Sequence, residues 1–321
     1  MIFYLGHIVK GLIKNNHRVL RNKTKSWSYG YNKDIDTVII SRDGTLGDIY
    51  SIMGLNIGFP EKAKVSQKYT RHELPKGLDE TTMNDSEHSE FIDEEFRRRY
   101  EGLWVFIKGY PVYMTGTYYY GMQWYREEVD PPKFRVIQNE LMIFWEACKA
   151  DERSYGMQYV KNRRMGATLL AIIELLEAGT ISEDKLLGII SKVGKDSSKI
   201  FRRLVKGFKR LPCFFRPPWD GTNTPKKELV LDMPTKRLKK GETIDESDGL
   251  GTTIGWHNTE LNAMDGDAIY RSLLDESGKY PPDVPFSEYW YIVKTSHTKG
   301  IRITGKSMVV STVNAMKKNM G

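Results

Sequence analysis

Residues 161–168 of this 321-residue chain gather the residue types that bind phosphate groups in proteins. The stretch runs Lys161, Asn162, Arg163, Arg164, Met165, Gly166, Ala167 and Thr168. Phosphate-binding loops commonly read G-x-x-x-x-G-K-[ST], where backbone amides and the lysine contact the phosphates and the hydroxyl binds Mg²⁺. The chain keeps Gly166 and Thr168, but it has Lys161 in place of the first glycine and Ala167 in place of the usual lysine.

The loss of the usual lysine is compensated if Lys161 takes over its role. Its ammonium group sits on a four-carbon side chain and can reach the same phosphate from the other end of the loop. Arg163 and Arg164 add positive charge where a triphosphate would meet the N-terminus of a helix. The alternative is a basic turn on a solvated face, and the loop alone supports both interpretations equally.

Two adjacent carboxylates, Asp275 and Glu276, follow the apolar segment 270–274. In NTPases with such a loop, an aspartate at a strand end holds Mg²⁺ and a following glutamate can polarise the attacking water. A solvated strand end is the simpler interpretation of the pair alone. Together with the preceding loop, the pair predicts a metal and hydrolysis site.

A third apolar segment, 308–310, ends in the hydroxyl residues Ser311 and Thr312. Motor ATPases use such a strand end to sense the γ-phosphate and to pass its loss to a moving element. Taken alone, serine and threonine after a strand more often begin a turn.

The three sites lie at the ends of segments that predict a regular alternation of strands and helices. We expect strands at 155–160, 186–191, 228–233, 252–256, 272–275 and 308–311, and helices at 134–150, 168–178 and 197–211. Such alternation predicts βαβ units, a largely parallel sheet and hence an α/β fold. Aromatic and β-branched residues at 104–107 and 113–120 predict two further strands.

The composition permits a large core, because 40% of the residues are hydrophobic and 12% are aromatic. The polar segment 62–89 predicts a boundary between an N-terminal extension, residues 1–90, and a domain at 91–321. A mean hydropathy of −0.50 and the lack of a long apolar run exclude a transmembrane helix. Two cysteines exclude a disulfide framework. The net charge of +8 favours polyanionic partners without identifying one.

Together the three sites resemble the ATPase domain of the large terminase subunit of tailed bacteriophages, the motor that packages genomic DNA. The resemblance runs from about Leu103 to Gly321 and includes the segments 118–124 and 132–138. Its specific parts are the loop, which is similar to a deviant form with its lysine at the start, and the Asp275–Glu276 strand end. The segment 310–312 matches the family's coupling motif. The resemblance implies a P-loop NTPase fold of the RecA-like (ASCE) type.

The resemblance also implies roles for the residues of the site, with ATP and Mg²⁺ as cofactors. Lys161 would neutralise the β- and γ-phosphates, Thr168 and Asp275 would hold Mg²⁺, and Glu276 would activate water. The remaining loop residues, Asn162, Met165, Gly166 and Ala167, would complete the nucleotide-binding loop.

Further roles follow from the same resemblance. Arg163 or Arg164 would stabilise the γ-phosphate, and Ser311 and Thr312 would couple hydrolysis to movement. Gln138 is a candidate for adenine recognition, with Gln123 and Gln158 as rivals. The implied partners are double-stranded DNA, a portal protein, a small terminase subunit and further copies of the chain in a homomeric ring, in the host cytoplasm and without a membrane.

Family members usually continue into an RNase H-like nuclease domain. The chain stops at Gly321, so we expect an ATPase portion without nuclease activity, either truncated or the product of a split gene. Ala167 leaves the rate of hydrolysis open.

Two other functions stay open. One is a helicase-like or other ring-forming P-loop ATPase, and the other is a non-hydrolysing structural or DNA-binding protein that keeps the fold. The basic helix expected at 195–210 suits contacts with DNA phosphates and suits a solvated amphipathic helix equally well.

Overall fold

The computed structural model describes residues 69–107, 110–127, 132–233 and 249–312, together with three two-residue strands, β1 (Trp27–Ser28), β2 (Tyr31–Asn32) and β3 (Thr37–Val38). Most of the predicted N-terminal extension and residues 313–321 of the predicted domain lie outside the described residues. Helix α2 (Ser86–Glu101) crosses the boundary expected at residue 90.

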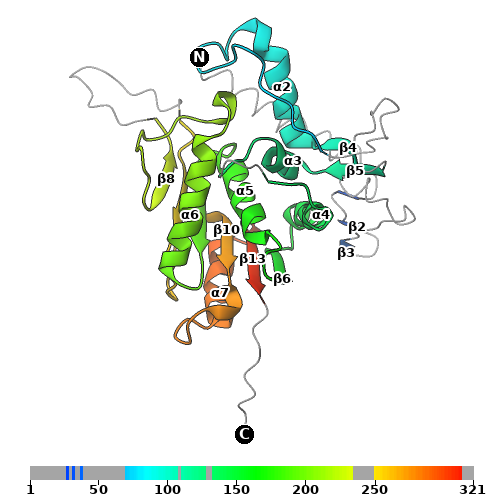
Figure 1. Cartoon of the computed structure of the whole chain (residues 1–321). Helices are drawn as coiled ribbons and strands as arrows, with labels where there is room; N and C mark the ends of the chain where they lie inside the picture. The colour runs from blue at the N-terminus through cyan, green and yellow to red at the C-terminus, as the bar shows by residue number, and fades with distance from the viewer. Residues whose placement is uncertain are drawn as a thin grey trace, which may run out of the picture.

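A six-stranded sheet forms the centre of the molecule (Figure 1). Its strands stand in the order β6 (Gly156–Lys161), β13 (Lys306–Thr312), β10 (Ile269–Asp275), β7 (Leu186–Ile190), β9 (Thr252–Trp256) and β8 (Glu228–Leu231). The first five strands are parallel to their neighbours, and only the edge strand β8 of this sheet is antiparallel to its partner. The predicted α/β fold with a mainly parallel sheet is therefore confirmed.

Strand β13 lies between the two strands that carry the predicted nucleotide site. Its Thr312 is in register with Lys161 at the end of β6, and its Val310 is in register with Asp275 at the end of β10. Carboxyl ends of parallel strands meet at one edge of a sheet, which is where α/β proteins bind ligands. This arrangement of strand, loop and helix is the one that the predicted P-loop NTPase fold requires.

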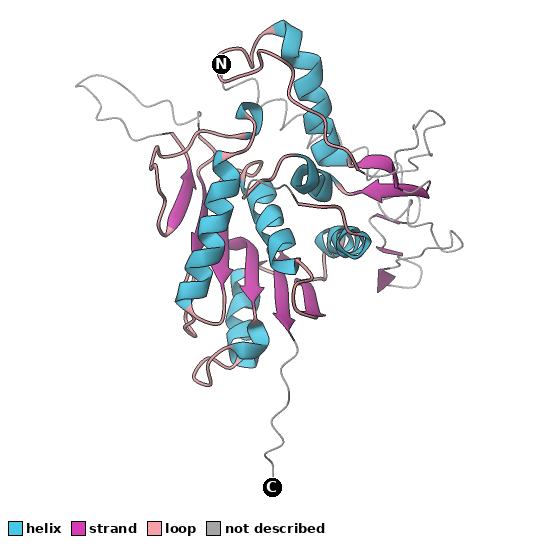
Figure 2. Ribbon diagram, viewed as in Figure 1, coloured by secondary structure: helices cyan, strands magenta, loops and turns pink. Residues whose placement is uncertain are grey.

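Helices cover both faces of the sheet (Figure 2). Helix α5 (Ala167–Gly179) follows β6, α6 (Gly194–Lys209) follows β7 and α7 (Phe286–Ser296) follows β10. Before the sheet, the chain forms a hairpin of β4 (Leu103–Ile107) and β5 (Tyr110–Met114), then α3 (Gly116–Gln123) and α4 (Val136–Ala150). Short elements complete the chain: η1 (Cys213–Phe215), η2 (Ser277–Lys279), β11 (Thr298–Lys299) and β12 (Arg302–Ile303).

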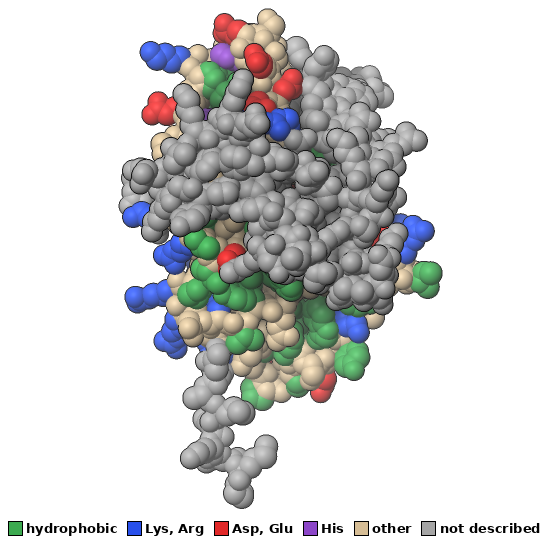
Figure 3. Space-filling view, turned by 90° about the vertical axis from the view of Figure 1, so that its right-hand side faces the viewer, with side chains coloured by type: hydrophobic (Ala, Val, Ile, Leu, Met, Phe, Trp, Pro, Cys, Tyr) green, Lys and Arg blue, Asp and Glu red, His purple; other side chains and the backbone are tan. Residues whose placement is uncertain are grey.

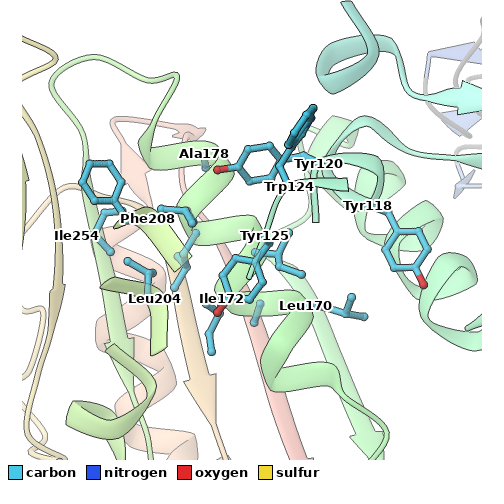
Figure 4. Packing of buried hydrophobic residues seen from close by; sticks show 14 of the residues in the cluster. Tyr118, Tyr120, Trp124, Tyr125, Leu170, Ile172, Ala178, Leu204, Phe208 and Ile254 are labelled. Atoms are coloured by element: carbon cyan, nitrogen blue, oxygen red, sulfur yellow. The ribbon is translucent and has the colours of Figure 1, made fainter. Parts of the chain in front are cut away.

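The core has two parts, one on each face of the sheet. Successive residues of β10 point to opposite faces: Leu273 packs with α5 and α6, whereas Leu274 packs with Tyr289 and Val293 of α7. Figure 4 shows the first part from close by, where side chains of α5 and α6 meet Tyr125. Helix α5 is buried on nearly all sides, so its sequence is apolar throughout rather than on one stripe.

The strand expected at 113–120 is wrong beyond Met114. The chain turns at Thr115 into α3, and the hydroxyl of Thr115 accepts a hydrogen bond from the amide of Tyr118 as a helix cap. Every residue of α3 is buried, and a helix that packs on all sides overrides the strand preference of its aromatic residues. In the part of the chain that the structure describes, no helix has the length and hydrophobicity that a membrane span needs.

Candidate nucleotide-binding site

In the loop between β6 and α5, the backbone at Gly166 has a conformation that favours glycine. Gly166 precedes α5 with φ +81°, the left-handed region that favours glycine. A side chain at this position would also place its Cβ 2.2 Å from Nε2 of Gln138. The backbone conformation therefore favours the glycine that the loop shares with the phosphate-binding pattern, and a larger residue would also push the amide of Gln138 aside.

Helix α4 supports this loop from outside. Nε2 of Gln138, a buried side chain, donates a hydrogen bond of 3.0 Å to the carbonyl of Met165, and Nη1 of Arg135 donates one of 3.2 Å to the carbonyl of Arg164. Gln138 thus holds the loop backbone, while its role in adenine recognition stays a prediction.

The two rivals of Gln138 lie elsewhere. Gln123 is buried, where it accepts a hydrogen bond from Tyr69 and donates one to the carbonyl of His72. Gln158 is an exposed residue of the edge strand β6.

The predicted metal ligands meet directly. Oγ1 of Thr168, in the first turn of α5, donates a hydrogen bond of 2.8 Å to Oδ1 of Asp275 at the end of β10. The other oxygen of Asp275 accepts a hydrogen bond of 3.0 Å from Ser191, at the end of the neighbouring strand β7. Burial raises the pKa of Asp275, these two hydrogen bonds oppose the rise, and the adjacent charge of Glu276 adds to it. A hydroxyl and a carboxylate at this distance form an oxygen donor set that suits Mg²⁺.

Lys161 points toward the same site from the end of β6. Its side chain is 7% exposed, and Nζ lies 3.8 Å from Oε1 of Glu276. The lysine at the start of the loop and the predicted catalytic carboxylate are therefore neighbours. Lys161 also lowers the pKa of Asp275, which places its charge close to the predicted metal ligand as well.

Glu276 is held by two donors. Its backbone has φ +52°, which is uncommon outside glycine and aims the side chain toward the end of β13. Oε2 accepts a hydrogen bond of 2.7 Å from the hydroxyl of Thr312 and a further one from Nζ of Lys279. Burial opposes ionisation of this carboxyl, but the hydrogen bonds from Lys279 and Thr312 outweigh it and lower its pKa to about 2.

The predicted coupling residues contact the segment that follows Glu276. Oγ of Ser311 accepts a hydrogen bond of 3.1 Å from the amide of Gly278, and Thr312 contacts both Glu276 and Lys279. The end of β13 is thus joined to the predicted catalytic carboxylate by hydroxyl groups.

The two loop arginines are not brought into this cluster. Arg163 and Arg164 are exposed, as is Asn162, and among the described residues neither arginine forms an ion pair. Their roles at the γ-phosphate stay predictions.

Sequence reasoning missed Ser191 and Lys279. A signal existed for Ser191, since a polar residue ends the buried strand at 186–190 beside the strand of Asp275; for Lys279, the only signal was its spacing of three residues from Glu276.

No protein-family model and no curated protein sequence matches the chain. Among solved structures, it is similar to the large terminase ATPase domain of Thermus phage P74-26, with 17% identity and a TM-score of 0.39 over 51% of this chain and 62% of that chain. A mutant of the same domain gives 16% identity and a TM-score of 0.38, over 50% of this chain and 61% of that chain. The chain thus covers less than two thirds of these structures. They belong to the family that the three sequence motifs resemble.

Proposed function

We propose that this chain binds ATP with Mg²⁺ and hydrolyses it to ADP and phosphate. The observation that carries the proposal is the contact between Thr168 and Asp275, beside Lys161 and Glu276. Lys161 of β6, Thr168 of α5, and Asp275 of β10 with Glu276 directly after it converge at the carboxyl edge of the sheet. Each is of a type that phosphoryl transfer needs.

Each residue has a role in the proposed reaction. Lys161 neutralises charge on the phosphates, and the amides of the loop and the N-terminus of α5 bind their oxygens. Thr168 and Asp275 would hold Mg²⁺, which would neutralise negative charge on the phosphates. Glu276 orients the attacking water and accepts its proton, after its carboxylate has left the hydroxyl of Thr312.

We further propose that hydrolysis drives movement of double-stranded DNA. The support is the resemblance of the three motifs to the packaging motor, together with the hydroxyl contacts that join Glu276 to the end of β13. Loss of the γ-phosphate would change the position of Glu276, and Thr312 would transmit that change. The portal protein, the small terminase subunit, a homomeric ring and the host cytoplasm follow from the same resemblance.

A non-hydrolysing nucleotide-binding protein is the second candidate function. It is favoured by the low pKa of Glu276 and by Ala167 at the usual lysine position, since a carboxylate with a pKa of about 2 is a weak base.

ATP turnover with Mg²⁺, measured with and without double-stranded DNA, tests these proposals. A hydrolysing chain loses turnover in Glu276→Gln and keeps it in Glu288→Gln, a control at an exposed glutamate of α7. A binding protein shows no turnover but binds ATP, and Lys161→Ala weakens that binding. If neither turnover nor binding is found, the assignment of Lys161 is wrong.

A further inference from the structure

All five exposed residues of α6 are cations: Lys195, Lys199, Arg202, Lys206 and Lys209. The opposite face of the helix is buried against the core through Ile200, Phe201, Leu204 and Phe208. The five cations therefore form one continuous stripe, which we call the α6 stripe.

The α6 stripe is nearly straight. Its members are spaced by four, three, four and three residues, so at 100° per residue they stay within an arc of about 80° around the helix. At 1.5 Å per residue they extend over roughly 21 Å along its axis. In Figure 1, α6 lies on the side turned toward the viewer. That side forms the left-hand edge of Figure 3, where several Lys and Arg side chains stand out.

Little within the described residues neutralises this stripe. Among the described residues, the one carboxylate within ion-pair distance of a stripe member is that of Asp196, which lies 2.8 Å from Lys199 and is also paired with Lys192. Arg203, which lies beside the stripe, is occupied by Glu127 at 2.7 Å. Like charges three and four residues apart repel on a helix, so the stripe opposes helix formation unless an anion lies against it.

Charge complementarity identifies the partner as a polyanion with regular spacing. Double-stranded DNA carries one negative charge per roughly 1.7 Å of its axis, so a stripe of this length faces several phosphates in any rotation. A bilayer surface fits less well, because a membrane-surface helix must insert an apolar face and the apolar face of α6 is buried in the core.

We propose that the α6 stripe is the surface through which this chain contacts the backbone of double-stranded DNA without regard to sequence. The inference rests on the proposed DNA-dependent function and adds the residues that make the contact. It assigns α6 a role separate from the nucleotide site, because none of the stripe members contacts Lys161, Asp275 or Glu276 in the described structure.

Duplex binding at a series of NaCl concentrations tests this inference. The triple change Lys195→Gln, Arg202→Gln, Lys206→Gln is compared with Lys76→Gln, Lys299→Gln, Arg302→Gln, which removes the same charges from exposed positions elsewhere. Fluorescence anisotropy with a labelled duplex gives the affinity and its salt dependence. We expect the first variant to lose at least about tenfold in affinity and to reduce the slope of log K against log[salt] by roughly 2.7, while ATP affinity without DNA is unchanged.

The outcomes separate the inference from the proposed function. Equal losses in both triple variants, or wild-type affinity in the α6 variant, overturn the α6 assignment and leave DNA binding by another surface. A wild-type chain that binds no duplex, or binds only anionic phosphatidylserine vesicles, overturns it together with the DNA part of the proposed function. ATP turnover, measured separately, still decides whether the chain is an ATPase. If the triple variant does not fold, judged by circular dichroism, the single change Lys206→Glu gives the same comparison against Lys299→Glu.

Discussion

The hydroxyl of Thr168 donates a hydrogen bond of 2.8 Å to Oδ1 of Asp275, although the two residues lie 107 positions apart in the chain. The contact joins the start of the largely buried helix α5 to the end of the central strand β10. The fold thus brings the two proposed magnesium ligands together.

Replacing Thr168 by valine removes this hydroxyl and keeps the shape of the side chain. We expect Thr168→Val to lose the gain in ATP affinity that Mg²⁺ confers, by about tenfold or more, because one oxygen donor is lost. Fluorescent ATP analogues titrated with Mg²⁺ and with EDTA measure this gain. Thr295→Val, at an exposed threonine of α7, is the control and keeps it. A Thr168→Val chain that still responds fully to Mg²⁺ would remove this residue from the metal site.

Replacing Gln138 tests whether this residue mainly supports the loop or recognises the adenine ring. If the main task of Gln138 is to hold the carbonyl of Met165, Gln138→Leu weakens binding of ATP and GTP alike. The loss of one hydrogen bond of about 1 kcal/mol corresponds to roughly fivefold in affinity. Competition binding of the two nucleotides gives both values, with Gln158→Leu on the exposed side of β6 as the control. Weakening that is confined to ATP would instead assign Gln138 to the adenine ring.

Lys279 affects stability through the carboxyl of Glu276. The pKa of about 2 means that the ionised carboxylate stabilises the fold at neutral pH, and that this contribution is lost as the pH falls from the ordinary value near 4.5 toward 2. Lys279→Met removes the stronger donor, so the variant should be less stable than wild type at about pH 7, and the difference should shrink at about pH 3. Urea unfolding at the two pH values measures it. A difference that does not depend on pH would show that Lys279 acts by packing alone.

Sequence patterns predicted the parts of the site that are local in the chain. The loop 161–168, the Asp275–Glu276 pair and the hydroxyls of Ser311 and Thr312 each follow an apolar strand, and parallel strands bring their carboxyl ends together by topology. The order of the strands was not predicted, and with it the position of β13 between β6 and β10 was missed. Strand order depends on contacts between distant segments, which periodicity does not encode.

Side-chain partners were the least predictable part. Ser191 and Lys279 take part in the site through single hydrogen bonds whose partners are fixed by the packing of β7 and of η2. The resemblance predicted that Gln138 contacts the adenine base. Its contact with Met165 was not predicted, because that contact depends on the close approach of α4 to Gly166. The helix at 116–123 was missed because its aromatic residues are buried on all sides, where packing outweighs local preference.

His297, which follows α7, contacts serine hydroxyls as a catalytic histidine would, but it is fully buried and cannot reach a substrate. Nε2 lies 2.7 Å from the hydroxyl of Ser307 and Nδ1 lies 2.8 Å from the carbonyl of Ile269, and no atom of this group reaches solvent to meet a substrate. Burial lowers the pKa of His297 to about 4, against the opposing hydrogen bond to Ile269, and the charges of Arg271 and Lys306 lower it further. The imidazole is therefore neutral in the folded chain.

A neutral buried imidazole makes stability depend on pH in a defined window. The unfolded chain takes up a proton at His297 near pH 6.5 and the folded chain only near pH 4, so stability is complete above 6.5 and falls as the pH drops toward 4. The loss attributable to this residue is about 3 kcal/mol. Free energies of unfolding in urea, measured at several pH values across this window, reveal the slope. We expect His297→Gln to be less stable than wild type at neutral pH and to lose this part of the slope, and an unchanged slope in the variant would mean that other groups cause it.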